Sequence, residues 1–372
     1  MRRAVPGALL ALGAGGCVEP YMPEVISAPT TYLVVDGFIN GSGRTRIKLS
    51  RTENIATLTA PPAEKGARIQ VVSEAGQHYA LTEKAEGLYQ SDSLQLPMGR
   101  YQLHITTAGG AAANYESDLT PLKITPPIDK LGFKLVDGQV RVVVSTHDET
   151  RQSIYYRWSF VETWEFNSAF LSSLEYDYTL KKIVGRTTPI YTCWHTEQSS
   201  LIQQGSSAQL SQDALTDVPL LAISTRAERL KVRYSVLVSQ YAETAAEFAY
   251  YEQLRKNTEA VGTINDPLPT QLTGNVHRVG QPTEPVLGFV GAHTVQRQRL
   301  FINRRDLSLP QTWLFDDPYR TCTTSDSLEE DFFSNPGVVP IAYVPAKPLF
   351  VGASAECADC RLRGSNVKPS FW

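Results

Sequence analysis

The chain has 372 residues, of which 42% are hydrophobic, and a formal net charge of −3. This length is sufficient for two domains with hydrophobic cores of their own. The 35 Lys and Arg residues are dispersed and are outnumbered by 38 Asp and Glu residues, which argues against a nucleic-acid partner.

The first 17 residues, MRRAVPGALLALGAGGC, carry the most specific pattern in the chain. Two arginines precede a short apolar run, which predicts a secretory signal. The AGGC ending is similar to a bacterial lipobox, although Leu12 lies five residues before Cys17 rather than three. We therefore expect 1–17 to be a lipoprotein signal peptide that ends at the lipidated Cys17, and 18–29 to be a tether. The alternative is ordinary signal-peptidase cleavage with Cys17 unmodified.

Residues 30–125 have the pattern of an immunoglobulin-like β-sandwich. Residues 46–49 alternate Arg, Ile, Lys and Leu, which predicts a strand with one buried face and one solvated face. Glycine-bearing turns separate such runs at the spacing expected of a sandwich. Domains of this class hold and present other molecules more often than they catalyse reactions. The candidate strands are 32–39, 44–51, 67–73, 78–82, 99–106 and 115–119.

The paired prolines of TPLKITPPI, at 120–128, mark the boundary to a larger domain at 126–372. This domain is also predicted to be mainly β, as a second β-sandwich-like body. Tyr156, Trp158 and Phe160 alternate with polar neighbours, so we expect Trp158 in its core. The candidate strands are 140–145, 154–164, 177–184, 226–241, 286–292 and 298–302.

One principal helix interrupts this β pattern. Thr244 lies three residues before Glu247, which is the spacing of a capping box. Phe248 and Tyr251 follow at helical spacing, and Gly262 is placed to end the helix. We expect this helix to pack across the end of a β-sandwich.

Two segments of the second domain, 196–219 and 306–340, are too long to be plain connectors. Binding functions concentrate in such segments. Aromatic rings near them suit contacts with a ligand or a partner, because Tyr and Trp combine an apolar body with a polar group. The candidate contact residues are Trp164, Trp194, Trp313, Phe315 and Tyr319.

Four cysteines follow Cys17, at Cys193, Cys322, Cys357 and Cys360. An even number in an exported chain predicts two disulfides, with three possible connectivities. We prefer those in which Cys357 and Cys360 reach different partners and staple the C-terminal tail to the long segments. A redox role for the CADC motif is disfavoured because the residues after it form a poor helix. A zinc site would need a second close cysteine pair.

The sequence carries few features of an enzyme. The chain lacks a G-x-S-x-G motif, and its six histidines lack an H-x-x-x-H spacing for metal. The cluster at 147–149, His-Asp-Glu, is expected to be a turn. The acidic stretch 325–331 lacks the glycine and the ligand spacing of an EF-hand loop and is expected to be solvated. We predict no catalytic residues, no metal and no cofactor, with paired carboxylates for glycoside hydrolysis left open.

Four further motifs resemble, over nearly the whole chain, a Bacteroidota lipoprotein family known as a domain of unknown function, DUF4249. They are TYLVVDGFIN, RYSVLVSQYAETAAEFAYYEQLRKNTEAVG, GNVHRVGQPTEPVLGFVGAH and the terminal CADCRLRGSNVKPSFW. The resemblance implies an outer-membrane lipoprotein of the kind that often accompanies a TonB-dependent transporter. It therefore implies a role in nutrient uptake.

These features predict a non-catalytic, lipid-anchored protein that is a binding or accessory component of a TonB-dependent nutrient uptake system. Its partners would be the membrane, through the lipid, a β-barrel transporter, and a peptide, glycan or other nutrient ligand. The alternative is a surface glycan-binding or adhesion module in which tryptophan faces hold sugar rings. A hydrolase is a third possibility.

Overall fold

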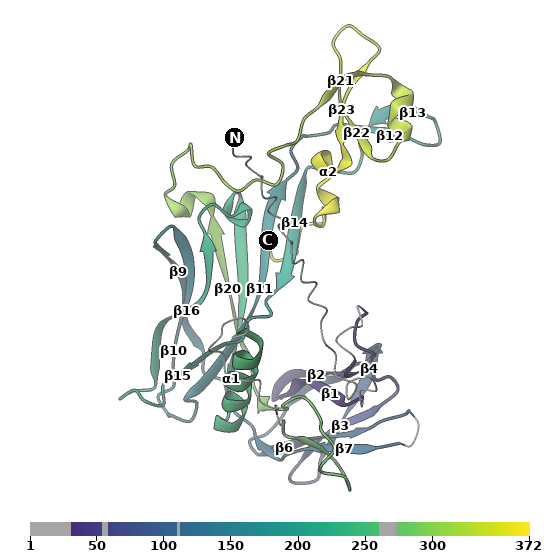
Figure 1. The fold of residues 1–372 in the computed structure, drawn as a ribbon. Coiled ribbons are helices and arrows are strands. Elements are labelled where there is room, and N and C mark those ends of the chain that lie inside the picture. Colours follow the sequence, from purple (N-terminus) through teal and green to yellow (C-terminus); the bar gives the residue numbers. More distant parts are fainter. Residues whose placement is uncertain (1–30, 54–58, 110–111, 260–271, 273) are drawn as a thin grey trace, which may run out of the picture.

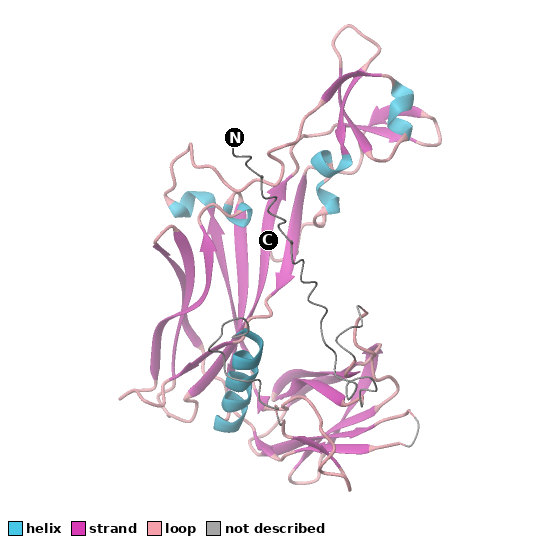
Figure 2. Ribbon diagram, viewed as in Figure 1, coloured by secondary structure: helices cyan, strands magenta, loops and turns pink. Residues whose placement is uncertain are grey.

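The structure, a computed structural model, describes residues 31–53, 59–109, 112–259, 272 and 274–372. The expected signal peptide, Cys17 and the tether lie outside these residues. The described chain is mainly β, which confirms the predicted fold class, and it forms an N-terminal body, a central body and a smaller distal body (Figures 1 and 2). None of the described helices is long and apolar enough to cross a membrane.

The N-terminal body is a ten-stranded sheet that curls around its own core and is immunoglobulin-like in class. On its second strand Ile47 and Leu49 are buried while Arg46 and Lys48 are exposed, as the alternation predicted. The strands of this body that come first in the chain are β1 (Leu33–Asn40), β2 (Ser42–Arg51), β3 (Arg68–Ser73), β4 (His78–Ala85), β5 (Leu88–Gln95), β6 (Arg100–Thr106), β7 (Asn114–Ser117) and β8 (Thr120–Pro121).

Two later segments complete this sheet. β18 (Val276–Arg278) pairs antiparallel with β7, and β19 (Ala292–His293) pairs parallel with β1. The strand order is therefore β18-β7-β6-β3-β4-β5-β2-β1-β19, with β8 beside β6. Both segments fall within the predicted second domain, 126–372, so the N-terminal body extends beyond 30–125. Alternation identifies a strand but not its neighbour, which is why the sequence did not reveal this return of the chain.

The central body is a sandwich of two sheets. Its strands are β9 (Ile128–Val136), β10 (Gln139–His147), β11 (Tyr155–Asn167), β14 (Thr192–Gln198), β15 (Gln203–Ser206), β16 (Ala214–Ser224), β17 (Arg233–Ala242) and β20 (Gln296–Asn303). One sheet has the order β16-β10-β9, and the other has the order β14-β11-β17-β20 with β15 beside β11. Trp158 lies in the core between them, as predicted, and its indole N–H donates to Gln240 Oε1 (2.8 Å).

The distal body projects from one end of the central sandwich (Figure 1). It consists of a hairpin, a three-stranded sheet with the order β21-β23-β22, and a short helix. Its elements are β12 (Leu174–Asp177), β13 (Lys182–Gly185), β21 (Ser325–Leu328), β22 (Val338–Tyr343), β23 (Phe350–Ser354) and α2 (Ala355–Ala358). The single strand predicted at 177–184 is wrong. A hairpin turn lies there because Asp177 Oδ1 accepts the N–H groups of Thr179 and Leu180 (2.8 and 2.9 Å).

The two segments judged too long to be plain connectors contain secondary structure of their own. The first contains β15 and the start of β16, and the second contains β21, the helical turn η4 (Glu330–Ser334) and the start of β22. The predicted strand at 226–241 is β17 preceded by the helical turn η2 (Glu228–Leu230), and 286–292 becomes a strand only at its end. The remaining helical turns are η3 (Arg304–Leu307) and η5 (Cys360–Leu362).

The principal helix is α1 (Ala245–Glu259), and it begins where the sequence predicted. Thr244 Oγ1 accepts the N–H of Glu247 (3.1 Å), which is one half of the expected capping box. Gly262 lies outside the described residues. The helix contacts both large bodies, because Phe248 packs on Tyr155 of the central sheet (4.9 Å) while Tyr250 packs on Phe289 of the returning segment (5.5 Å).

Candidate functional site at the joint of the two large bodies

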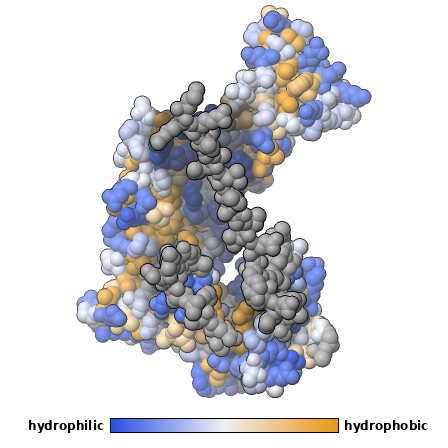
Figure 3. All heavy atoms as spheres, in the orientation of Figure 1, coloured by the Kyte–Doolittle hydropathy of each residue, from blue (hydrophilic) through white to orange (hydrophobic). Residues whose placement is uncertain are grey.

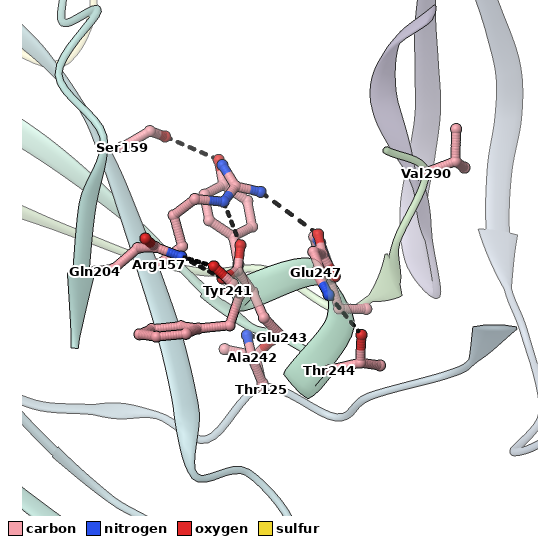
Figure 4. Close-up of polar contacts among 12 residues, drawn as sticks. Thr125, Arg157, Ser159, Gln204, Tyr241, Ala242, Glu243, Thr244, Glu247 and Val290 are labelled. Atoms are coloured by element: carbon pink, nitrogen blue, oxygen red, sulfur yellow. Dashed lines mark hydrogen bonds and ion pairs between the residues drawn. The ribbon is translucent and has the colours of Figure 1, made fainter. Parts of the chain in front are cut away.

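The linker between the N-terminal and central bodies is hydrogen-bonded on both sides. Lys123 N–H donates to Ala292 O, and Thr294 N–H donates to Lys123 O (both 2.9 Å). Thr125 Oγ1 accepts the N–H of Ala242, at the end of β17 (3.0 Å; Figure 4). The linker is therefore hydrogen-bonded within the joint, and its fixed backbone sets the angle between the bodies.

Arg157 of β11 is the centre of the joint (Figure 4). Its guanidinium donates to the carboxylate of Glu243 and lies 3.7 Å from Glu247 Oε1 of α1. Gln204 of the neighbouring β15 donates to Glu243 Oε2 (3.1 Å) and to Phe248 O (3.0 Å). The side chains of Glu243 and Glu247 are 0% and 2% exposed, so these ion pairs are buried. Removing one partner of such a pair costs about 3–5 kcal/mol.

The N-terminal body closes this cluster with one imidazole and one phenyl ring. His293 is fully buried, and its Nε2 lies 3.4 Å from Glu247 Oε1. Phe38 of β1 stacks on the imidazole at 4.3 Å and meets Tyr241 of β17 edge-on at 5.4 Å. These rings keep water from the charges, which strengthens the electrostatic interactions across the joint.

Two glycines allow the backbone to come this close. A Cβ at Gly291 would lie 2.2 Å from Glu247 Oε2, so any other residue would push the carboxylate of α1 away. Gly288 has a φ of +122°, and a Cβ there would lie 1.9 Å from the carbonyl oxygen of Val35. The glycines of the GFVGAH motif therefore serve the contact between the returning segment and its neighbours.

The joint places two carboxylates, of Glu243 and Glu247, beside the single guanidinium of Arg157. Burial raises the pKa of Glu243 to about 7, although Arg157 opposes the rise, and the nearby Glu247 adds to it. Glu247 Oε1, Gln204 Oε1 and both ring nitrogens of His293 are buried without a hydrogen-bond partner. The cluster can therefore take up and release a proton near neutral pH while it holds the two bodies together.

The sequence did not identify this site. Glu247 was visible only as a capping residue, Arg157 only as a polar position on a strand, and His293 only as a lone histidine. The single available signal was the pair of glycines on either side of Phe289 and Val290, which indicates close backbone approach but not what approaches. The partners come from strands and a helix that are far apart in the chain.

A turn beside the linker confirms the expectation for residues 147–149. Asp148 accepts the N–H groups of Gln152 and Ser153 (3.1 and 2.9 Å), which is the local bonding typical of an Asp-led turn. This turn, the linker prolines and Met98 line a hollow of about 540 Å³. The carboxylate of Asp148 is used within the turn, so the hollow offers mainly apolar contacts.

A second hollow, of about 390 Å³, opens at the edge of the central sandwich between residues 197–203 and β16. Glu162 is buried there and accepts from Tyr234 Oη (2.6 Å) and Arg229 (2.7 Å). Glu197 faces Glu162 across the β11–β14 pair, and the Cβ atoms of such neighbours are about 4.5–5.5 Å apart. The other lining residues include Phe160, Gln198, Gln203, Leu220 and Leu221.

Three of the five aromatic residues proposed as contacts surround the C-terminal tail. Trp164 packs on His195 (4.5 Å), whose Nδ1 donates to Arg363 O (2.6 Å). Trp194 is paired with the tail through two backbone hydrogen bonds (2.8 and 2.9 Å). Tyr319 is buried, with the guanidinium of Arg363 5.0 Å from its ring centre. The Tyr319 ring therefore contacts the tail directly, Trp164 reaches it through His195, and Trp194 binds it through the backbone.

The other two proposed contact residues lie in the central core. Trp313 is half-buried, and its indole N–H donates to Thr225 O (3.0 Å). Phe315 is buried, with Arg304 4.9 Å from its ring centre. The five residues thus do not form one exposed surface. They were proposed as contacts because they lie near predicted loops. Trp313, Phe315 and Tyr319 do lie outside the named helices and strands, but Phe315 and Tyr319 are buried.

The four cysteines form the disulfides Cys193–Cys360 and Cys322–Cys357. As predicted, Cys357 and Cys360 reach different partners and staple the tail at the base of the distal body. The tail ends on the central sheet, where the indole N–H of Trp372 donates to Glu165 Oε2 (3.0 Å). In the part of the chain that the structure describes, no three His, Cys, Asp or Glu residues are arranged to hold a metal ion.

The fold and the joint define an extended, mainly β protein with an immunoglobulin-like N-terminal body. The chain belongs to the family described as a domain of unknown function (DUF4249), which matches residues 18–299. No curated protein matches the chain. A two-domain fibronectin type-III segment of chicken tenascin is similar at 13% identity over 57% of this chain and 91% of that one, with a TM-score of 0.16. A Salmonella alpha-2-macroglobulin is similar at 10% identity, with a TM-score of 0.19. The match covers 74% of this chain and 15% of the Salmonella chain.

Proposed function

We propose that this protein is a non-catalytic outer-membrane lipoprotein, anchored through Cys17, that acts as a binding or accessory component of a TonB-dependent nutrient uptake system. The buried joint carries the proposal. It fixes two large β bodies at one angle, and preorganised surfaces of this kind suit a protein that engages a large partner at more than one place. The charged side chains of the joint are buried inside it, where a substrate does not reach them.

The N-terminal sequence and the family support the cellular setting of this proposal. A signal that ends in AGGC suits export followed by lipidation of Cys17. The transporter would be the β-barrel partner, and the nutrient, whether a peptide, a glycan or another small molecule, would be the shared ligand. A lipid on the first mature residue keeps the protein at the membrane without any spanning helix.

Purification from native outer membrane tests this function. We expect mass spectrometry to find acyl chains on Cys17 and a β-barrel transporter to copurify with the protein. Arg157→Met, which opens the joint, is expected to lower the yield of transporter. Arg141→Met, which removes an exposed arginine paired with Asp137, is expected to leave the yield unchanged. An unmodified Cys17, or repeated purifications without a barrel protein, would refute the proposal.

Glycan binding or adhesion is the second candidate function, and the polar hollow of the central sandwich favours it. Glu197, Gln198, Gln203 and Arg229 offer hydrogen-bond donors and acceptors for sugar hydroxyls beside apolar side chains. Glu197→Gln combined with Gln198→Ala is expected to abolish saturable binding to a polysaccharide. The exposed Glu86→Gln on the N-terminal body is the control. A glycan array on which the wild-type protein binds nothing removes this candidate.

A further inference from the structure

The distal body carries a surface that lies away from the joint. The body projects at the end of the molecule opposite the N-terminal body (Figure 1), and hydrophobic residues reach its surface (Figure 3). Both disulfides lie at its base, so this surface is held in place relative to the central sandwich. A fixed, projecting surface with apolar groups is a candidate for contact with another molecule.

A hollow of about 320 Å³ opens on this body, and Leu328, Phe332 and Val338 form its apolar wall. Phe332 is 51% exposed. Its neighbour Phe333 is fully buried and packs edge-on against Phe350 (5.8 Å). Because Phe333 anchors the helical turn η4, the exposure of Phe332 follows from the turn geometry and not from loose packing.

Gly352 allows the sheet and the helical turn η4 to pack closely. A Cβ at Gly352 would lie 2.7 Å from Leu328 Cδ1 and 2.9 Å from Phe333 Cε1, so the sheet and the turn touch only because position 352 has no side chain. The hollow is therefore part of a packed structure. An apolar group that entered it would meet a preformed wall.

Acidic residues flank Leu328 and Phe332 along the chain. Asp326, Glu329 and Asp331 are exposed, and none of them forms an ion pair with another described residue. The distal segments 174–185 and 323–359 together contain eight acidic residues and three basic residues, Lys181, Lys182 and Lys347, whereas the whole chain is close to neutral at −3. Negative charge is thus concentrated on this body, and a positively charged partner would relieve the repulsion among these groups.

We infer that the distal surface, formed by Asp326, Leu328, Glu329, Asp331, Phe332 and Val338, docks a basic segment of a protein partner whose apolar side chain enters the hollow. The inference rests on the proposed function, because it names the surface through which an accessory protein would engage its partner. The acidic rim would steer and orient the partner, and the apolar centre would slow its release. The same rim repels an anionic lipid surface.

Photocrosslinking in native outer membrane tests the distal surface. A photoreactive amino acid is placed at Phe332 and, as a control of similar exposure, at Leu135 on β9, where the native side chains are 51% and 45% exposed. We expect a crosslink at 332 to a partner peptide rich in Lys or Arg. A triple variant should lower the yield of this crosslink about tenfold, as the loss of three exposed ion pairs with the partner implies. Its substitutions are Asp326→Lys, Glu329→Lys and Asp331→Lys. The yield should also fall in 1 M salt, where the Debye length is about 3 Å.

A matched triple variant controls for the change in net charge. Glu86→Lys, Asp137→Lys and Glu149→Lys reverse three exposed acidic residues elsewhere and should leave the crosslink intact. A crosslink to a second copy of this chain, or one that survives the distal triple variant, would overturn the inference. A crosslink yield at position 332 no higher than that at position 135 would also overturn the inference. If the transporter still copurifies in that case, the proposed function stands. Loss of both signals would overturn both.

Discussion

The charged joint and the base of the distal body both fix one body on another, but they do so by different chemistry. At the joint, Arg157, Glu243, Glu247 and His293 meet without a covalent link. At the base, two disulfides bind the tail and the 322 region to the rest of the chain. The joint therefore depends on burial and protonation, whereas the base depends on oxidation. A change of pH or a single substitution should act on the first, and a reductant on the second.

The two regions also differ in how they hold their polar groups. The joint leaves Glu247 Oε1 and both nitrogens of His293 without a hydrogen bond, so its ion pairs are only partly satisfied. The tail is bonded along its length, because Arg363 makes two hydrogen bonds to Glu228 (2.9 and 2.6 Å) and Trp194 holds the backbone of Ser365. The joint is the more easily altered of the two, and substitutions there should show it.

Loss of the Cys193–Cys360 disulfide should have the largest effect. The bond joins residues 167 apart, and the chain-entropy estimate for a loop of that length is about 5 kcal/mol. Cys193→Ala with Cys360→Ala should lower the free energy of unfolding by this amount, measured by urea unfolding with hydrogen exchange in β14. The control is the Cys322–Cys357 pair, which closes a separation of 35 and should cost about 4 kcal/mol. A larger loss in the control variant would contradict the loop-length argument.

Arg157→Met should have the next largest effect. It leaves the carboxylates of Glu243 and Glu247 buried without their cation, and we expect a loss of about 4 kcal/mol, seen as faster hydrogen exchange in β11 and α1. Arg141→Met is the matched control, because Arg141 pairs with Asp137 at an exposed site (3.6 Å) and should change stability by less than about 0.5 kcal/mol. Equal losses in the two variants would mean that the joint contributes no more than a surface pair.

The base of the distal body could be predicted from the sequence, and the joint could not. Four cysteines in a chain predicted to be exported allow three pairings. Two of these three pairings join Cys357 and Cys360 to different partners, as the structure does. Arg157, Glu243 and His293 belong to common residue types that usually lie in solvent. Their role arises only when β11, α1 and β19 meet, which periodicity along the chain does not encode.

The fold shows the same limit at a larger scale. The alternation in β2 and around Trp158 was sufficient to predict strands, their buried faces and the mainly β class. The return of β18 and β19 to the first sheet and the separate distal body were not predicted, because both depend on pairing between distant segments. Tyr319 and Phe315 were proposed as contacts because they lie near an irregular segment. Both rings are buried, since whether a ring in such a segment faces inward depends on neighbours that are distant in the chain.

The pH dependence of the joint is the third prediction. The pKa of Glu243 is about 7 in the folded protein, above the ordinary value of 4.5, so the folded state binds a proton that the unfolded state releases. The stability that this proton provides is complete below pH 4.5 and is lost as the pH rises through 7. At about 1.4 kcal/mol per pKa unit, the loss is about 3 kcal/mol. Urea unfolding at pH 5, 6 and 8 measures it.

Glu243→Gln isolates the contribution of this carboxyl group. The amide keeps a hydrogen-bond acceptor for Arg157 and leaves one carboxylate, that of Glu247, opposite one guanidinium. The variant should therefore lose the pH slope between 5 and 8 and should be at least as stable as the wild type at pH 8. A slope that persists in this variant would contradict the assignment of the proton to Glu243.

Gly291→Ala should have the smallest effect and gives the most local test of the joint. The new Cβ would lie 2.2 Å from Glu247 Oε2 and must displace that carboxylate, which we expect to cost about 2 kcal/mol. In a Glu247→Ala background the obstacle is gone, so the same substitution should cost much less. Urea unfolding of the four proteins in this double-mutant cycle measures the coupling between positions 247 and 291. An equal loss of stability in both backgrounds would show that glycine at 291 is needed for the local backbone conformation. The position of the Glu247 carboxylate would then not depend on it.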